Sequence, residues 1–197
     1  MSENQTVIFV DIDGPLVPQK MHYFGQNRRA GKEPENYPMF DPWAVRVFNM
    51  WARYGKAKIV FCTHWTHSWS VEELQDVMKH NGLGFDYHED CVTPKRMSSE
   101  KGHEIHWWLK AHPECTNFII VEDDHSCAWV ENFIADMPVK GRWIQVDYSD
   151  GISMKNFRDG CEQLGINHEQ LMFEEFGVPI LTEEEKKARE MLLRAMI

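Results

Sequence analysis

A run of four apolar residues without a polar neighbour, VIFV at positions 7–10, is the feature that most constrains the fold of this chain. A strand exposed on one face alternates apolar and polar residues, whereas an uninterrupted apolar strand is covered on both faces, as in a parallel sheet. Gly14 and Pro15 then end the run. We therefore expect a central strand of a sheet that carries helices on both faces.

Further runs of β-favouring residues have the same character: KIVFC at 58–62, FIIV at 118–121 and RWIQV at 142–146. Residues 85–92 are compatible with one more short strand. Helical periodicity fills the segments between them, and the expected helices are residues 42–55, 70–80, 100–111, 127–136 and 153–165, with a last one that opens at Thr182. Strands that alternate with helices imply an α/β fold built on a parallel sheet with right-handed crossovers.

Capping residues indicate where several of these helices begin. Asp41 is placed as the N-cap of the first helix, and Ser70 opens a capping box at the second. Ser98 or Ser99 can cap the helix that follows. Each of these residues accepts a hydrogen bond from a backbone N–H that the helix itself leaves unpaired.

The chain of 197 residues has the size of one α/β domain with a short appendage. We assign residues 1–165 to this domain and residues 166–197 to a helical extension packed on it. Residues 19–40 are rich in Gly, Pro, Asn and charge, so we expect a long, lid-like loop there. The last helix has an apolar stripe for packing on the domain or, alternatively, for a homodimer contact: Ala188, Met191, Leu192, Ala195 and Met196.

Composition excludes several classes of protein. A formal net charge of -10 argues against an extended grip on nucleic-acid backbone, which needs many Lys and Arg, although Arg28, Arg29 and Lys32 form one local basic cluster. The five cysteines are scattered without a CxxC pair, which disfavours a disulfide framework or a zinc ribbon. Since no membrane-spanning run and no signal peptide is indicated, we expect a cytoplasmic protein.

Asp11 and Asp13 directly follow the first strand, at the carboxyl end where open α/β sheets bind ligands. Period-2 alternation would point both side chains to the same side. Two carboxylates so close repel each other, and a hard divalent cation with oxygen ligands is the simplest compensation. The alternative is an ordinary Asp-rich turn.

Other strand ends carry reactive side chains as well. Thr63 follows the second run, and Asp123 and Asp124 follow the third. Lys101 lies in the first turn of a helix, where acidic residues are preferred, so it is either aimed at an anion or simply solvated. Acid pairs for a metal, with a hydroxyl and a cation for an anion, suit phosphoryl transfer.

These residues form four ordered motifs that resemble those of the haloacid dehalogenase (HAD) superfamily of phosphohydrolases. Residues 11–16 (DIDGPL) look like the first motif, DxDGxL, and residues 61–63 (FCT) like the second. Lys101 with Gly102 looks like the third, and residues 121–124 (VEDD) like the fourth. The resemblance covers residues 7–147 and implies a Rossmann-like three-layer fold and a Mg²⁺-dependent reaction through an aspartyl-phosphate.

The resemblance also implies roles for single residues. Asp11 would be the nucleophile, and Asp13 the general acid and then base. Thr63 would bind a phosphoryl oxygen, and Lys101 would neutralise charge on nucleophile and phosphate. Mg²⁺ would be held by the Asp11 carboxylate, the Asp13 backbone carbonyl and a carboxylate of Asp123 or Asp124, of which Asp123 is favoured.

Many members of the superfamily carry a sizeable cap domain between motifs, and here the gaps leave room only for a minimal one. A minimal cap implies an open site, suited to a nucleotide or a nucleic-acid terminal phosphate, unless the lid-like loop or a partner subunit covers it. The compact build and the run Thr63-His64-Trp65 are similar to HAD domains attached to nucleic-acid repair enzymes.

Residues beside the second motif leave alternatives open. His64 is a candidate phosphate-binding residue, while a plain polar loop role is the alternative for it and for His67 and His125. Trp65 and Trp69 either stack on a base or pack at the rim of the core, and packing is favoured.

The main functional hypothesis is a phosphomonoester hydrolase, such as a nucleotidase or a phosphatase of nucleic-acid ends. A non-hydrolytic protein that captures a phosphorylated ligand is the alternative, against which the intact Asp11 and Asp13 count. A phosphotransferase that passes the phosphoryl group to an alcohol is the third.

Overall fold

The computed structural model describes residues 4–24, 27, 30–95, 100–135, 137 and 139–195. They fall into two compact units, residues 1–166 and residues 167–197. The first unit contains all the strands and every residue of the four motifs. No helix in the described ranges is long and apolar enough to cross a membrane.

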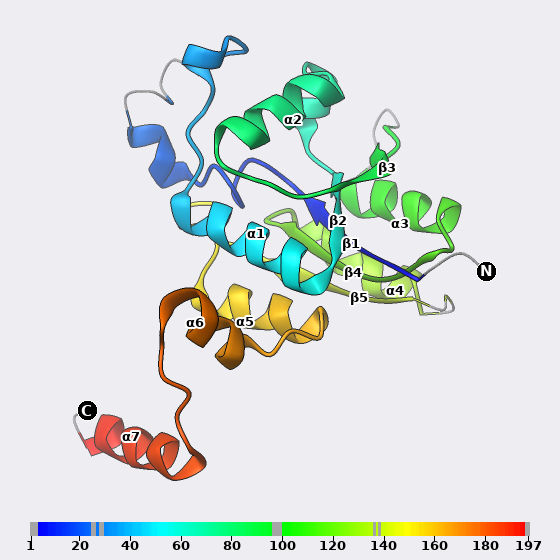
Figure 1. Ribbon diagram of the computed structural model, residues 1–197. Coiled ribbons are helices and arrows are strands. Elements are labelled where there is room, and N and C mark those ends of the chain that lie inside the picture. Colours follow the sequence, from blue (N-terminus) through cyan, green and yellow to red (C-terminus); the bar gives the residue numbers. More distant parts are fainter. Residues whose placement is uncertain are drawn as a thin grey trace. The chain divides into compact units, whose positions relative to one another are not determined.

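The first unit is built on a parallel sheet of five strands in the order β3-β2-β1-β4-β5 (Figure 1). The strands are β1 (Gln5–Val10), β2 (Ala57–Phe61), β3 (Tyr87–Val92), β4 (Cys115–Glu122) and β5 (Lys140–Gln145). The four strands expected from long apolar runs and the short one are therefore confirmed. β1 lies in the centre, as the apolar run predicts, and the fold is a Rossmann-like α/β fold.

Helices cover the sheet on both faces. α1 (Pro42–Gly55) and α5 (Met154–Gln163) pack against each other in front of the sheet in Figure 1, where the Trp51 indole donates to the Phe157 carbonyl. α3 (Lys101–Ala111) and α4 (Val130–Phe133) pack against each other on the opposite face, over Val7 and Phe9. α2 (Val71–His80) connects β2 to β3.

Most helix boundaries follow the capping signals. Asp41 accepts from the Trp43 amide, and Ser70 forms the expected capping box. Glu100, rather than a serine, occupies the N-cap of α3, so Lys101 is the first helical residue. The predicted caps Ser98 and Ser99 lie outside the described residues.

The prediction of one helix over residues 127–136 is wrong. A 3-10 turn (His125–Trp129) comes first and α4 follows it, because the Asp124 carboxylate accepts from the Ser126 amide and starts the turn early. Asp136 lies outside the described residues. Residues 19–40 contain 3-10 turns at Gln19–Tyr23 and Pro34–Asn36, which the sequence pattern did not predict.

The second unit consists of α6 (His168–Phe176) and α7 (Glu183–Ala195). α6 was not predicted, although the Asn167 side chain caps it and Gly177 ends it in the left-handed region at φ 65°. Lys186 of α7 pairs with Glu169 of α6 at 2.7 Å. Within the apolar stripe, Met191 and Leu192 are exposed and Met196 lies outside the described residues, so packing on the domain and dimer formation stay predictions.

The core between the sheet and α3 is aromatic. Trp108 is 1% exposed, contacts Phe9 edge to face at 5.2 Å between ring centroids, and donates its indole N–H to the Asp90 carbonyl. Each of the five cysteines is buried and free.

We expect Trp108→Ala to lower the free energy of unfolding by about 3–5 kcal/mol, because it leaves a cavity and removes a hydrogen bond. Trp129→Ala is the matched control, since Trp129 is 58% exposed, and its effect should stay within about 0.5 kcal/mol. Urea unfolding at unchanged slope measures both. Equal effects of the two changes would contradict this assignment of the core.

Candidate active site

The candidate site lies at the carboxyl ends of β1, β2 and β4. β1 lies between β2 and β4. From β2 the chain continues outward to β3, and from β4 it continues outward to β5, so the strand order reverses at β1. Asp11 follows β1, Thr63 follows β2 after one residue, and Asp123 follows β4. The sheet topology thus gathers residues that are far apart in the sequence.

Alternation along the strands decides which side chains face α3. Phe9 is in register with Val60 of β2 and with Ile120 of β4, and all three belong to the core beneath α3. Two residues further along, Asp11 and Glu122 keep the same side. Their carboxylates therefore point to the start of α3.

Lys101 connects these two carboxylates. Its Nζ lies 3.0 Å from Asp11 Oδ2 and 2.7 Å from Glu122 Oε2, and its side chain is 7% exposed. Burial acts to lower the pKa of Lys101, but the negative charges of Asp11 and Glu122 outweigh burial and raise it. The lysine is therefore a fixed cation at the site and not a solvated one.

Glu122 was not assigned a role from the sequence. Its side chain is fully buried; Oε2 accepts from Lys101, and Oε1 accepts from the amides of Asp123 and Asp124 at 3.0 and 3.1 Å. Burial and the neighbouring Asp11 charge raise the pKa of Glu122, against the lowering effect of the Lys101 ammonium. A signal for Glu122 was present in the sequence: Phe118, Ile120 and Glu122 alternate along β4, so Glu122 lies on the side of the strand that faces α3 and Lys101.

Asp11 has one oxygen that the described protein atoms leave unpaired. Oδ2 faces Lys101, whereas Oδ1 is buried and has no hydrogen-bond partner among the described residues. Burial raises the pKa of Asp11, against the lowering effects of Lys101 and of the Thr63 hydroxyl. An orphaned, buried carboxylate oxygen is costly, which indicates a ligand at this position.

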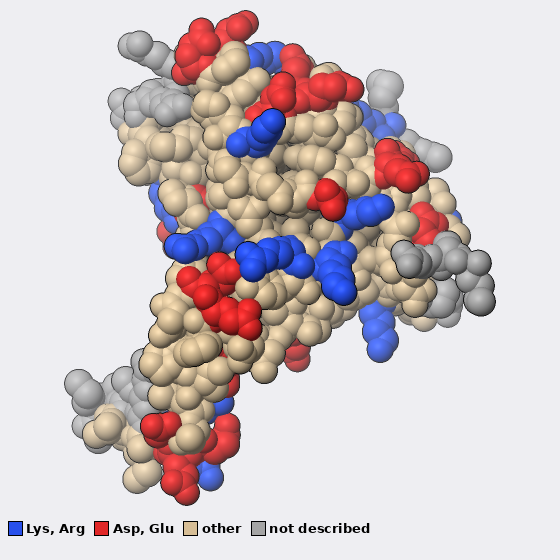
Figure 2. Space-filling model, viewed as in Figure 1, with Lys and Arg blue, Asp and Glu red and all other residues tan. Residues whose placement is uncertain are grey.

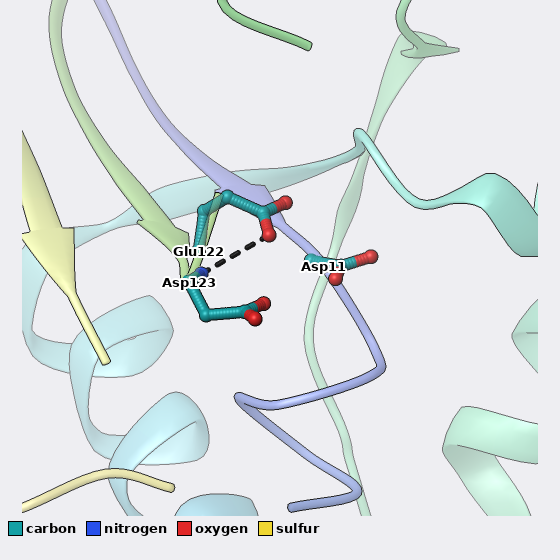
Figure 3. Close-up of side chains that lie close together, drawn as sticks. All are labelled: Asp11, Glu122 and Asp123. Atoms are coloured by element: carbon teal, nitrogen blue, oxygen red, sulfur yellow. Dashed lines mark hydrogen bonds between the residues drawn. The ribbon is translucent and has the colours of Figure 1, made fainter. Parts of the chain in front are cut away.

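Three carboxylates lie close together at this edge of the sheet. One oxygen each of Asp11, Glu122 and Asp123 lies within 4.8 Å of the others (Figure 3). Because both Glu122 oxygens are already engaged by an ammonium and two amides, Asp11 and Asp123 are the better donors for a cation. Oxygen donors of this type fit a hard divalent metal ion.

Asp123 and Asp124 have different surroundings. Asp123 approaches the turn after β1 so closely that a Cβ on Gly14, whose φ is 84°, would lie 2.8 Å from Asp123 Oδ1. Asp124 instead caps the following 3-10 turn through the Ser126 amide. The structure therefore brings Asp123 to Asp11 and uses Asp124 in the backbone turn; which of the two binds a metal stays a prediction.

Thr63 and Asp13 are linked through Trp65. Thr63 is buried and accepts the Trp65 amide at 3.3 Å, which starts a 3-10 turn, His64–His67. The Trp65 indole N–H donates to Asp13 Oδ2 at 2.8 Å. Trp69 stacks on Trp65 with ring centroids 5.3 Å apart.

The histidines near the site are exposed. The rings of His64 and His67 lie 5.7 Å apart, and His125 is next to Gln145, whose Nε2 is 3.4 Å from its Nδ1. His64 directly follows Thr63, and its phosphate-binding role stays a prediction.

The local basic cluster is only partly described. Lys32 pairs with Glu73 at 2.8 Å and lies over the Trp69 ring, whereas Arg28 and Arg29 lie outside the described residues. On the face shown in Figure 2, several Lys and Arg side chains lie in a row across the middle, and groups of Asp and Glu lie above and below this row. The expectation that no extended nucleic-acid backbone is bound stays a prediction.

Gly102 explains how α3 reaches the site. A Cβ at this position would lie 2.3 Å from the carbonyl oxygen of Ser126, and the Gly102 amide donates to the Ser126 hydroxyl at 3.3 Å. A residue without a side chain therefore allows the first turn of α3, with Lys101, to lie directly against the segment after β4.

A protein-family model described as the HAD domain in Swiss Army Knife RNA repair proteins matches residues 7–157. The matched segment includes most of β1, the other four strands and the four motifs. No curated protein and no solved structure matches the chain.

We expect Gly102→Ala to lower the free energy of unfolding by about 2 kcal/mol or more, because the added methyl group meets a backbone carbonyl that no side-chain rotation can relieve. Gly84→Ala is the control, since a Cβ there meets nothing within 4 Å, and its effect should stay within about 0.5 kcal/mol. Thermal unfolding of both variants measures the difference, and a harmless Gly102→Ala would contradict the close approach.

Proposed function

The chain belongs to the family of HAD domains in Swiss Army Knife RNA repair proteins, and from this premise we propose that it is a Mg²⁺-dependent phosphomonoesterase that removes a terminal phosphate from RNA. The reaction would proceed through an aspartyl-phosphate on Asp11. The observation that carries the proposal is the Asp11 carboxylate, held by Lys101 on one oxygen and left without a described protein partner on the other.

Asp11 is the proposed nucleophile. One of its carboxylate oxygens attacks phosphorus, a P–O bond to Asp11 forms, and the bond between phosphorus and the ester oxygen breaks. Lys101 stands 3.0 Å from Asp11 Oδ2, where it would stabilise the negative charge of the carboxylate and of the transferring phosphoryl group. Thr63 would hold a phosphoryl oxygen through its hydroxyl.

Asp13 is the proposed general acid and base. In the first half of the reaction it gives a proton to the leaving ester oxygen, so that a neutral hydroxyl departs. In the second half it takes a proton from the water that attacks phosphorus. Phosphate then leaves and the Asp11 carboxylate is restored.

Three groups would hold Mg²⁺: the Asp11 carboxylate, the Asp13 backbone carbonyl and the Asp123 carboxylate. The buried, unpartnered Asp11 Oδ1 and the nearby Asp123 fit an oxygen-ligated cation. When bound, the ion would neutralise phosphoryl charge and offset the repulsion among the acidic side chains. Glu122 would act through Lys101 and the amides after β4.

A terminal phosphate is the favoured substrate because the gaps between the motifs leave little room for a cap. α1 and the turns of residues 19–40 fill the first gap, while α2 and β3 fill the second. The net charge of -10 favours recognition of one end over a long contact with the backbone. A free nucleotide is the second substrate class that such a site would accept.

We expect wild-type protein with Mg²⁺ to release phosphate from one of a panel: RNA and DNA oligonucleotides phosphorylated at either end, mononucleotides and a generic aryl phosphate. Chelator should abolish release, and Asp11→Asn should lower turnover by at least about 10³-fold, because an amide is a poor nucleophile. RNA oligonucleotides should be the best substrates. Malachite-green detection of phosphate measures the rates.

Three results would count against the proposal. Tight stoichiometric binding of a phosphorylated end without any release would indicate a ligand-capturing protein. Transfer of the phosphoryl group to added alcohols in preference to water would indicate a phosphotransferase. Undiminished turnover in Asp11→Asn would exclude the proposed nucleophile.

We expect Mg²⁺ to raise the melting temperature of wild-type protein relative to chelator, because a ligand that binds only the folded state stabilises it. Asp123→Asn should reduce this shift markedly. Asp124→Asn is the matched control, since Asn caps a turn about as well as Asp, and it should retain the shift. The reverse outcome would assign the metal to Asp124.

A further inference from the structure

The Asp13 carboxylate receives a hydrogen bond from a tryptophan. The Trp65 Nε1 lies 2.8 Å from Asp13 Oδ2, and Asp13 is half-buried. Within the described part of the chain, Trp65 is the side chain that donates to this carboxylate. An indole N–H donates only and never accepts, so the bond distinguishes the two oxygens of Asp13.

Trp65 is itself held in place at both ends. Its backbone amide donates to the Thr63 hydroxyl oxygen at 3.3 Å, which ties its position to the end of β2. Its ring is stacked on Trp69 with an interplanar angle of 25°. Trp69 in turn contacts Tyr37, at 6.2 Å between ring centroids, and the Lys32 ammonium, at 5.3 Å from the ring centroid.

We infer that Trp65 is a positioning residue for Asp13: its indole N–H occupies Oδ2 and leaves Oδ1 as the oxygen that exchanges protons with the substrate. The inference rests on the proposed function. As Asp11 forms its bond to phosphorus and the ester bond breaks, the proton on Asp13 Oδ1 passes to the leaving oxygen. When water attacks the aspartyl-phosphate, Oδ1 takes a proton from that water. The bond between phosphorus and the Asp11 oxygen then breaks, its electrons return to the Asp11 carboxylate, and phosphate leaves.

This arrangement fixes the direction in which the acid points. A carboxylate on a turn after a strand has rotational freedom about its side-chain bonds, and a misdirected acid loses most of its catalytic effect. The bond from a ring that is packed on a second ring restricts that freedom. The turn that starts at Thr63 therefore ties the direction of the Asp13 carboxylate to the end of β2, through the Trp65 indole.

The leaving group separates a positioning role from a merely structural one. The leaving group of an aryl phosphate is a phenolate. The phenolate of a strongly acidic phenol departs without protonation, whereas that of a weakly acidic phenol needs a proton from the general acid. The value of kcat/KM reports the steps up to loss of the leaving group and is independent of the later attack by water. We therefore expect the defect of a Trp65 variant to grow with the basicity of the leaving group.

The experiment compares wild type, Trp65→Phe and Trp69→Phe with Mg²⁺ on 4-nitrophenyl phosphate and phenyl phosphate. Trp65→Phe keeps an aromatic ring and lacks the N–H; it should lose about 10-fold or more in kcat/KM on phenyl phosphate and less than about 3-fold on 4-nitrophenyl phosphate, since general acids contribute about 10²–10⁴-fold. Trp69→Phe should affect both esters alike. Replacement of Trp65 by 3-benzothienylalanine, which has sulfur in place of the N–H, provides a variant of nearly unchanged shape.

Each outcome decides one of the two claims. If wild type hydrolyses both esters and both Trp65 variants lose equally on them, or lose nothing, the positioning role is overturned and the proposed function stands. If wild type hydrolyses neither these esters nor phosphorylated oligonucleotides, the proposed function fails and the role of Trp65 fails with it. A defect confined to phenyl phosphate in both variants supports the inference.

Discussion

The ion pairs of Lys101 with Asp11 and Glu122 are the interaction on which the site depends. All three groups are nearly or fully buried, and two carboxylates without this cation would stand uncompensated in a low-dielectric interior. The lysine reaches them because Gly102 lets α3 begin directly against the segment after β4. Backbone packing and charge balance are therefore parts of one arrangement, and a change that moves the start of α3 also changes the charges around the proposed nucleophile.

The fold was largely predictable from the sequence because each strand is a short apolar run and most helices carry a side-chain cap. The prediction failed where a local hydrogen bond competed with periodicity. Asp124 starts a 3-10 turn that precedes α4, and α6 is a short helix without a strong apolar face, so its signals were Asn167 and Gly177 alone. The turn at Gln19–Tyr23 is paired with a segment far away in the sequence, since the Gln19 amide donates to the Tyr148 carbonyl.

The proximity of several candidate site residues was predictable from the sequence, but not all of their contacts. Motif order placed Asp11 and Lys101 together, and the structure adds that Glu122 pairs with the same lysine. Alternation along β4 carried that information, since Glu122 continues the pattern of Phe118 and Ile120 on the side that faces α3. The bond between Trp65 and Asp13 joins residues 52 positions apart and depends on the geometry of a 3-10 turn, which no sequence pattern specifies.

The most direct test of the central claim is to look for the phosphoryl group on the enzyme. Wild-type protein is mixed with Mg²⁺ and a 3′- or 5′-phosphorylated RNA oligonucleotide, quenched in acid within a turnover, digested and analysed by mass spectrometry. The account predicts a phosphoryl group on the peptide that contains Asp11, and at that residue. Release of phosphate with no phosphorylated peptide, or with the group on another residue, would contradict the assignment of Asp11 as the nucleophile.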